Sequence, residues 1–242
     1  MKVKISIIVP VYNEERTIDE VIKKIARKDF GLEKEIIVVN DGSVDSTREV
    51  LGRLNEKNVR IINYSKNKGK GYVVRKGIKE AKGEIIAIQD ADLEYNLDDL
   101  KNLIGILIKE NFKVIYGSRF LEKNKHYKIN SFYIANRLLS LLTSILYFRK
   151  ITDMETCYKV FRKEALKEIK LNSKGFEFEP EITAKFIKKG YKIKEIPISY
   201  KPRSKEEGKK IKWKDGVIAA YTLLRNRFSP QSQIPQFSRL LH

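Results

Sequence analysis

Hydrophobic and polar positions in the first half of the chain follow a rhythm that predicts strands separated by amphipathic helices. Apolar runs are typical of strands buried on both faces, and segments built around such runs predict strands at residues 5–10, 35–40, 59–64, 84–89 and 113–117. Apolar residues at helical spacing predict helices at 17–28, 72–81 and 97–109, and Ser46 with Glu49 is the pattern of a capping box. This alternation predicts an α/β fold with a mostly parallel central sheet and flanking helices.

The rhythm changes after Gly117. An apolar segment covers 131–150, a polar stretch covers 152–162, and a helix is expected at 179–189, closed by Gly190. A strand at 192–197, a basic loop at 200–212 and a helix at 213–228 follow. No internal repeat or linker is evident, so residues 1–228 are expected to form a single domain, with a mobile tail at 229–242.

The charge and composition of the chain indicate which kinds of molecule it binds. The 242 residues include 50 Lys and Arg against 31 Asp and Glu, and the formal net charge of +19 favours an anionic partner. A lysine-rich surface of the kind found in heat-adapted proteins explains the lysine content but not the imbalance. The single cysteine, Cys157, excludes an intrachain disulfide, and two histidines disfavour a His-rich zinc site. Because Pro10 and polar residues end the first apolar run early, residues 1–10 predict a strand rather than a signal peptide.

Two carboxylates follow the apolar run at 84–89, at a place where open α/β sheets bind ligands. Asp90 and Asp92 lie one residue apart, and Glu94 comes two residues later. Oxygen ligands without nearby His or Cys favour Mg²⁺ or Mn²⁺ over softer metals. The alternative is a set of solvated loop carboxylates, or a cap for the helix at 97–109. A metal here would indicate a substrate that carries phosphates.

The other strand ends deliver polar groups to the same edge. Tyr12 and Glu14 follow the first strand, Asp41 follows the second, and Lys70, between two glycines, follows the third. An aromatic ring with carboxylates can hold a nucleoside, and a Gly-Lys-Gly loop can approach a diphosphate, although turn formation alone also explains these glycines. The chain has no P-loop and no G-x-G-x-x-G after its first strand, which disfavours nucleotide triphosphatases and dinucleotide enzymes.

These motifs, taken in order, resemble the signature of the family 2 glycosyltransferases with the GT-A fold. The matching residues are VPVYNE at 9–14, VNDGS at 39–43 with Asp45 and Thr47, Asn67 with Gly69 and Gly71, and DADLE at 90–94. Later segments resemble the dolichyl-phosphate sugar synthases: GSRF at 117–120, Asp153 with TCYKVFR at 156–162, GF-F-E-E across 175–181, and Tyr200 to Lys210. The resemblance covers roughly residues 3–228.

The resemblance implies a role for each matched residue. The nucleotide-sugar would be held by Pro10, Tyr12, Glu14, Asp41, Lys70, Asp90, Ala91 and Glu179. The metal would be held by Asp90, Asp92 and Glu94, and the acceptor phosphate by Arg119, Arg203, Lys209 and Lys210. The catalytic residues would be Asp92, Arg119, Arg203 and Glu181. Two departures are Thr156-Cys157, where many relatives have a Ser/Thr-Gly pair, and Glu94, where Gln is common.

The resemblance implies inverting, metal-dependent transfer of a hexose from a nucleotide-sugar to dolichyl or polyprenyl phosphate. GDP-mannose is slightly favoured as the donor, with UDP-glucose and UDP-N-acetylglucosamine as alternatives. Residues 1–117 would then bind the nucleotide-sugar, and 118–228 would bind the acceptor and the membrane interface. A lipid phosphate is already ionised near neutral pH and needs no general base. A related enzyme acting on a sugar hydroxyl would need Glu181 or Glu179 as a base. The ordered motifs disfavour a basic nucleic-acid-binding module.

Two apolar segments predict contact with a membrane surface. Residues 138–148 are apolar but bounded by Arg137 and Arg149, and they are too short to span a bilayer, which needs roughly 20 apolar residues. The segments 131–150 and 213–228 therefore suit interfacial helices, with ordinary core helices as the alternative. With the net charge, they predict a peripheral protein on the cytoplasmic face of an anionic membrane, without a transmembrane helix. The oligomeric state cannot be read from the sequence.

Overall fold

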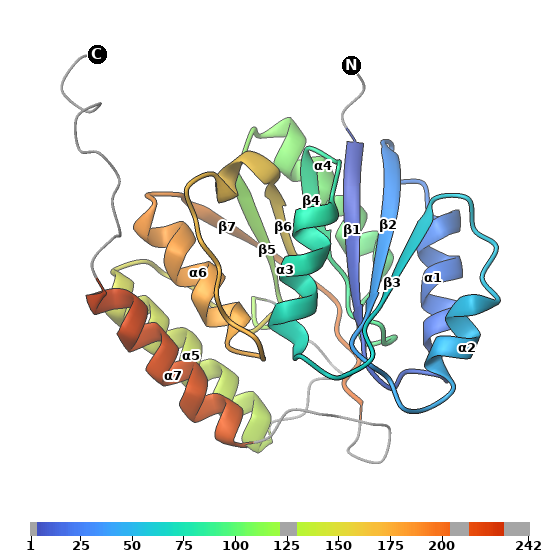
Figure 1. Ribbon diagram of the computed structural model, residues 1–242. Helices are drawn as coiled ribbons and strands as arrows, with labels where there is room; N and C mark the ends of the chain where they lie inside the picture. Colours follow the sequence, from blue (N-terminus) through green and yellow to red (C-terminus); the bar gives the residue numbers. More distant parts are fainter. Residues whose placement is uncertain (1–3, 122–129, 204–212, 230–242) are drawn as a thin grey trace.

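The computed structural model describes residues 4–121, 130–203 and 213–229. Seven strands form one sheet: β1 (Lys4–Val11), β2 (Glu33–Asn40), β3 (Val59–Asn63), β4 (Ile85–Ile88), β5 (Val114–Ser118), β6 (Lys159–Arg162) and β7 (Ile193–Pro197). The helices are α1 (Ile18–Arg27), α2 (Thr47–Gly52), α3 (Lys70–Glu80), α4 (Leu97–Lys109), α5 (Ser131–Tyr147), α6 (Phe178–Lys188) and α7 (Trp213–Phe228), with a short 3₁₀ helix at Lys163–Leu166. The predicted α/β class is confirmed (Figure 1).

The sheet is mostly parallel, in the order β3-β2-β1-β4-β6-β5-β7. Only β6 runs antiparallel among the strands of the described residues, and it lies between β4 and β5. This strand lies within 152–162, where the sequence pattern indicated only a polar stretch. The pattern hid it because β6 is only four residues long and its buried first residue is a lysine, Lys159. One sheet thus includes strands from both sides of residue 117.

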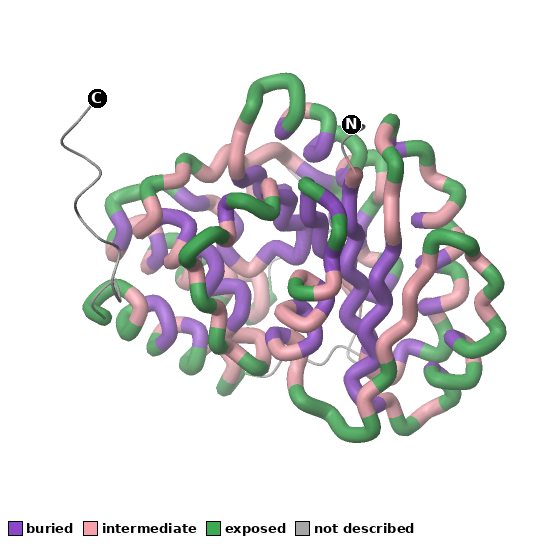
Figure 2. Tube along the Cα trace, turned by 45° about the horizontal axis from the view of Figure 1, so that its top comes forward, coloured by how far each residue is buried: buried purple, intermediate pink, exposed green. Residues whose placement is uncertain are grey.

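Burial explains the apolar runs. Every residue of β4 is buried, and so is every residue of β1 after Lys4, because helices cover both faces of the sheet. In Figure 1, α3 and α6 lie in front of the sheet and α4 lies behind it. The buried trace in Figure 2 follows the central strands, while their ends reach intermediate or exposed loops. The carboxyl ends of β1, β2 and β4 therefore open together at one edge.

The start of α2 corrects one local prediction. Ser46 makes no side-chain cap, so the expected capping box with Glu49 does not form. The Asp45 carboxylate instead accepts from the Thr47 backbone N–H at 3.0 Å, and Glu15 accepts from the Ser46 backbone N–H at 2.9 Å. The helix is anchored to the loop after β1 rather than capped within itself. The predicted closure of α6 is confirmed, because Gly190 follows it with φ +86°.

Helices α5 and α7 pack together against α6 as a second, smaller apolar cluster. Tyr147 ties the two helices by donating from its hydroxyl to the Leu223 carbonyl at 2.8 Å. Their outer sides carry exposed apolar residues: Ile134, Leu138, Leu141, Ile145, Val217, Ile218, Tyr221 and Leu224. The helices therefore contribute to the core on one side and leave an apolar surface on the other. Within the described ranges, no helix is long and apolar enough to cross a membrane.

Candidate active site

A cavity of about 320 Å³ lies at the carboxyl ends of β1, β2 and β4. Its wall is completed by segments after β5, β6 and β7 and by the start of α6. The structure brings twelve of the predicted site residues to this cavity: Pro10, Tyr12, Glu14, Asp41, Lys70, Asp90, Ala91, Asp92, Glu94, Arg119, Glu179 and Arg203. Sequence reasoning did not single out Tyr95, Phe132, Asn136, Glu155 or Phe176, which also line it.

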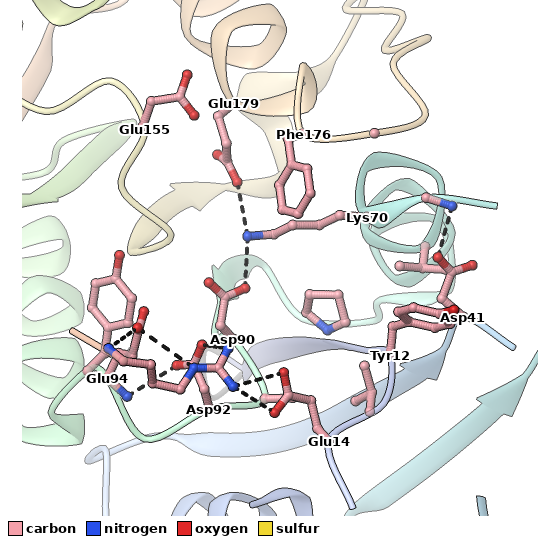
Figure 3. A pocket seen from close by; sticks show the side chains of 18 of the residues that line it. Tyr12, Glu14, Asp41, Lys70, Asp90, Asp92, Glu94, Glu155, Phe176 and Glu179 are labelled. Carbon is pink, nitrogen blue, oxygen red and sulfur yellow. Dashed lines mark hydrogen bonds and ion pairs between the residues drawn. The ribbon is translucent and has the colours of Figure 1, made fainter. Parts of the chain in front are cut away.

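Asp41 and Tyr12 mark one end of the cavity (Figure 3). The Asp41 carboxylate accepts from the backbone N–H groups of Lys68 at 2.7 Å and Gly69 at 2.8 Å. Burial raises the pKa of Asp41, although both hydrogen bonds act against that rise. Asp41 therefore fixes the loop that leads from β3 into α3.

The glycines beside Lys70 join two parts of the chain. Gly69 has φ +95°, and a Cβ there would lie 2.3 Å from the Lys174 carbonyl oxygen. The Gly71 N–H donates to the Gly175 carbonyl at 3.1 Å, and the Tyr72 N–H donates to Lys174 at 2.9 Å. From the sequence, the two glycines were expected to let this loop approach a diphosphate. In the structure the N–H groups of Gly71 and Tyr72 are used by the backbone of 174–175, so Lys70 carries the charge that faces the cavity.

Lys70 lies between two carboxylates at the first turn of α3. Its Nζ is 2.8 Å from Asp90 Oδ1 and 3.5 Å from Glu179 Oε1, as Figure 3 shows. Burial favours a lower pKa for Lys70, but nearby negative groups, led by Asp90, raise that pKa well above its ordinary value. Burial would also raise the pKa of Asp90, and Lys70 reverses the effect and lowers it. Both groups are therefore charged near neutral pH.

Arg203 is held among the acidic residues of the cavity. Its Nη1 lies 2.9 Å from Glu14 Oε2, its Nη2 lies 2.9 Å from Asp92 Oδ2, and its backbone N–H donates to Glu94 Oε1 at 2.6 Å (Figure 3). The Tyr200 hydroxyl also donates to Glu94, at 3.0 Å. Burial, followed by the charges of Asp90 and Glu94, raises the pKa of Asp92 to about 8. Arg203 thus offsets only part of the negative charge.

The donor chemistry fits Mg²⁺ or Mn²⁺, but the described residues do not form a ready metal site. No group of three or more His, Cys, Asp or Glu side chains among them is arranged to hold a metal ion. The predicted set of Asp90, Asp92 and Glu94 is divided, because Lys70 pairs with the first while Arg203 approaches the other two. The pKa of Asp92 is raised partly because Asp90 and Glu94 are negatively charged, and a divalent cation would neutralise this charge.

Arg119 reaches the cavity from the end of β5. Its guanidinium makes a bidentate pair with buried Asp153, at 2.7 Å for both Nε and Nη2, and its backbone N–H donates to the same carboxylate at 2.9 Å. The guanidinium carbon lies 5.1 Å from the centre of the Tyr200 ring. Asp153 therefore positions Arg119 rigidly. The sequence analysis noted Asp153 in a matched segment but gave it no function.

The structure separates Glu181 from the other predicted catalytic residues. Its carboxylate accepts from the backbone N–H groups of Asn172 at 3.0 Å and Ser173 at 2.8 Å, and it pairs with Lys185. It borders a second hollow of about 500 Å³ on another side of α6. Because residues two apart on a helix point about 200° apart, Glu179 and Glu181 cannot face one cavity. Lys209 and Lys210 lie outside the described residues.

Comparisons with known proteins identify the family of the chain. The model of glycosyl transferase family 2 matches residues 6–170. A dolichol-phosphate mannosyltransferase of Pyrococcus furiosus is 32% identical over 214 residues, which are 85% of this chain and 59% of that protein. A dolichyl-phosphate beta-glucosyltransferase of Trichomonas vaginalis is 30% identical over 242 residues, with 93% of this chain and 73% of that protein covered. The chain thus spans about three fifths of the Pyrococcus relative.

Solved structures with low sequence identity share the fold. Glucosyl-3-phosphoglycerate synthase from Mycobacterium tuberculosis, crystallised with Mn²⁺, UDP and phosphoglyceric acid, aligns with a TM-score of 0.69 at 21% identity, over 95% of this chain and 80% of that one. Mannosyl-3-phosphoglycerate synthase from Rubrobacter xylanophilus aligns with a TM-score of 0.71 at 17% identity, over 93% and 72%. Because the family model matches more than half of the chain and the relatives are about 30% identical, the chain belongs to family 2 of the glycosyltransferases, with the GT-A fold.

Proposed function

We propose that this protein transfers a hexose from a nucleotide-sugar to dolichyl or another polyprenyl phosphate, with inversion at the anomeric carbon. The observation that carries the proposal is the pair Arg119 and Arg203, which two separate segments bring to one cavity. In such a reaction the acceptor phosphate must approach the diphosphate of the donor, and the two anions repel each other. Fixed cations lower the energy barrier that this repulsion causes. A phosphate acceptor is already ionised and needs no base. Of the two candidate bases for a hydroxyl acceptor, Glu181 borders another hollow, and Glu179 lines the cavity but is paired with Lys159 and Lys70.

Each charged group of the cavity has a role in this proposal. Lys70, beside Asp90, would neutralise the diphosphate of the donor, and Arg119 and Arg203 would orient the acceptor phosphate towards the anomeric carbon. Asp90, Asp92 and Glu94 would hold Mg²⁺ or Mn²⁺ once Arg203 turns from the carboxylates to a phosphate. When bound, the metal supplies positive charge to the leaving diphosphate.

The relatives suggest candidates for the donor. They are named as a mannosyltransferase and a glucosyltransferase of dolichyl phosphate, and a structural neighbour binds UDP. We therefore propose GDP-mannose first, with UDP-glucose and UDP-N-acetylglucosamine as alternatives. The aromatic ring of Tyr12 and the loop fixed by Asp41 line the end of the cavity where the nucleoside would lie.

The acceptor would reach the cavity from a membrane surface. The outer sides of α5 and α7 expose Leu138, Leu141 and Tyr221, and α7 ends in the basic residues Arg225 and Arg227. An apolar side with basic residues suits the interface of an anionic bilayer. We propose peripheral attachment to the cytoplasmic face, which places a lipid phosphate next to the cavity.

The direct test is a transfer assay on the purified protein with dolichyl phosphate in detergent. Each reaction contains Mg²⁺ or Mn²⁺ and one of GDP-mannose, UDP-glucose or UDP-N-acetylglucosamine, and mass spectrometry detects the glycolipid. We expect one donor to give a lipid-phosphate hexose, and Asp92→Asn to lose the product. Asp19→Asn, in an exposed pair with Lys23 on α1, is the matched control. Absence of glycolipid with every donor, together with transfer to a soluble sugar hydroxyl, would establish the alternative acceptor class.

A further inference from the structure

Glu155 lies at the end of the cavity beyond Lys70. Figure 3 shows Asp41 and Tyr12 at one end, Lys70 with Asp90 between, and Glu155 with Glu179 at the other end. Glu155 comes from the loop before β6, and Glu179 from the first turn of α6. This sequence of groups follows the order of nucleoside, diphosphate and sugar in a nucleotide-sugar.

Glu155 has no counter-ion among the described residues. Its Oε1 is buried and has no hydrogen-bond partner there. Lys159 and Arg119 are the cations that act on its charge, but Lys159 already pairs with Glu179 at 2.6 Å and Arg119 with Asp153 at 2.7 Å. A carboxylate that faces a cavity without a partner carries an uncompensated cost of desolvation.

The arrangement around Glu155 is rigid. Buried Lys159 donates to the carbonyl oxygens of Met154 at 2.9 Å and Thr156 at 2.6 Å, the two neighbours of Glu155. The same ammonium group holds Glu179. A single cation therefore holds the backbone on both sides of Glu155 and the carboxylate of Glu179, so both residues are positioned at the cavity before a ligand arrives. Fixed acceptors of this kind give specificity for a ligand with matching donors.

We propose that Glu155 determines sugar specificity by accepting hydrogen bonds from hydroxyl groups of the transferred hexose, with Glu179 as the second acceptor. The inference rests on the proposed function, because it places the sugar of a nucleotide-sugar between these residues and Lys70. Hydroxyl groups donate to carboxylates, whereas the carboxylate of a hexuronic acid would be repelled by both. The donor sugar is accordingly a neutral hexose.

Calorimetric titration separates the sugar from the nucleotide. The wild-type protein and the Glu155→Ala and Glu155→Gln variants are titrated with GDP and GDP-mannose, and with UDP, UDP-glucose, UDP-N-acetylglucosamine and UDP-glucuronic acid. All titrations contain Mg²⁺ and are made at a pH above 8, where Glu155, with a pKa of about 7, is ionised. We expect the affinity of each variant for the free diphosphate to stay within about twofold of wild type. The ratio of the affinity for the neutral sugar donor to the affinity for the free diphosphate should be about tenfold lower in Glu155→Ala than in wild type. This change corresponds to the loss of roughly one good hydrogen bond to a charged group.

A gain of binding provides a second measurement that damage to the fold cannot produce. If the protein binds uridine nucleotides, Glu155→Gln should bind UDP-glucuronic acid several-fold more tightly than wild type while binding UDP-glucose more weakly. If it binds guanosine nucleotides, GDP-mannuronic acid and GDP-mannose take their places. Glu84→Gln, at an exposed carboxylate outside the cavity, is the matched control and should leave every ratio unchanged.

The proposed function and the role of Glu155 fail in different ways in these titrations. A wild-type protein that binds none of these nucleotide-sugars overturns the proposed function, and the inference about Glu155 falls with it. A wild-type protein that binds one of them while the Glu155 variants keep the same sugar-to-diphosphate ratio overturns only the inference. Thermal unfolding of each variant verifies that it is folded, and Glu155→Asp tests the position if Glu155→Ala does not fold.

Discussion

Lys159 Nζ lies 2.6 Å from Glu179 Oε2, and both side chains are buried. The lysine enters the sheet as the first residue of β6, and the glutamate lies on α6, so the pair links the central sheet to the helix beside the cavity. Its ammonium group also lies 4.7 Å from the centre of the Tyr116 ring. Burial of this charge is therefore compensated by a carboxylate, two carbonyl oxygens and an aromatic ring.

Removal of the lysine should destabilise the protein strongly. Lys159→Met leaves Glu179 with Lys70 as its remaining ion-pair partner, at 3.5 Å, and we expect a loss of about 3–5 kcal/mol in the free energy of unfolding. Urea denaturation measures this loss. Lys76→Met, which breaks a more exposed pair with Glu80, should lower the free energy of unfolding far less. Equal effects of the two substitutions would contradict the structural role given to Lys159.

Glu155 should make stability depend on pH in the protein without ligand. Burial, and then the charge of Glu179, raises the pKa of Glu155 from 4.5 to about 7, against the opposing effects of Lys159 and Arg119 and with a further rise from Asp153. Because the folded state binds the proton more tightly than the unfolded state, the stabilisation is present below pH 4.5 and is lost as the pH rises to about 7.

Glu155→Gln should remove this pH dependence. We expect the free energy of unfolding of wild type to fall, relative to that of the variant, by up to about 3 kcal/mol between these pH values. Urea titrations at several pH values give the difference in the free energy of unfolding between wild type and variant. The pH dependence contributed by Asp92 is the same in both proteins and cancels in this difference. Parallel profiles for wild type and variant would show that Glu155 ionises normally.

Arg203 should compete with a metal ion for the same carboxylates. It pairs with Glu14 and Asp92, so binding of Mn²⁺ requires its displacement. We expect Arg203→Gln to bind Mn²⁺ about tenfold more tightly than wild type when no nucleotide is present, a change of ~1.4 kcal/mol. Electron paramagnetic resonance of free Mn²⁺ measures this without turnover. Arg60→Gln, at a pair with Glu80, is the control, and weaker Mn²⁺ binding by Arg203→Gln would reject the competition.

The exposed side of α5 and α7 should determine membrane binding. Leu138→Glu and Tyr221→Glu place charges at residues that are 60% and 63% exposed, so the fold should tolerate them. Each should weaken sedimentation with phosphatidylcholine vesicles containing phosphatidylglycerol by about tenfold, the value of one apolar side chain leaving the interface. Val44→Glu, in the loop after β2, is the control. Binding that survives both substitutions would place the membrane contact elsewhere.

Much of the fold and part of the site could be predicted because strand ends converge by topology. Once the runs ending near Tyr12, Asp41 and Asp90 were identified as parallel strands, their side chains had to meet at one edge, and they do. Hydrophobic periodicity could not reveal β6, since the buried charge of its lysine is paired with Glu179, on a helix that follows later in the chain. Nor could it show that Arg203, more than a hundred residues after Asp92, lies against that carboxylate.

Glu179 and Glu181 illustrate the limit of motifs. A shared pattern named both residues, but only the direction of each side chain on α6 distinguishes the one that reaches the cavity. The metal, the acceptor and the membrane surface remain predictions, because their evidence is chemical complementarity rather than a shared shape.

The position of β6 has a consequence for how such enzymes diverge. This strand and the loop before it form one contiguous stretch, residues 153–162, which carries Glu155, Lys159 and the aspartate that orients Arg119. The end of the cavity that carries Tyr12 and Asp41 is built by other segments, β1 and β2 and the loops that follow them. If Glu155 determines sugar specificity as proposed, substitutions within these ten residues can change the sugar preference without altering the segments around Tyr12 and Asp41.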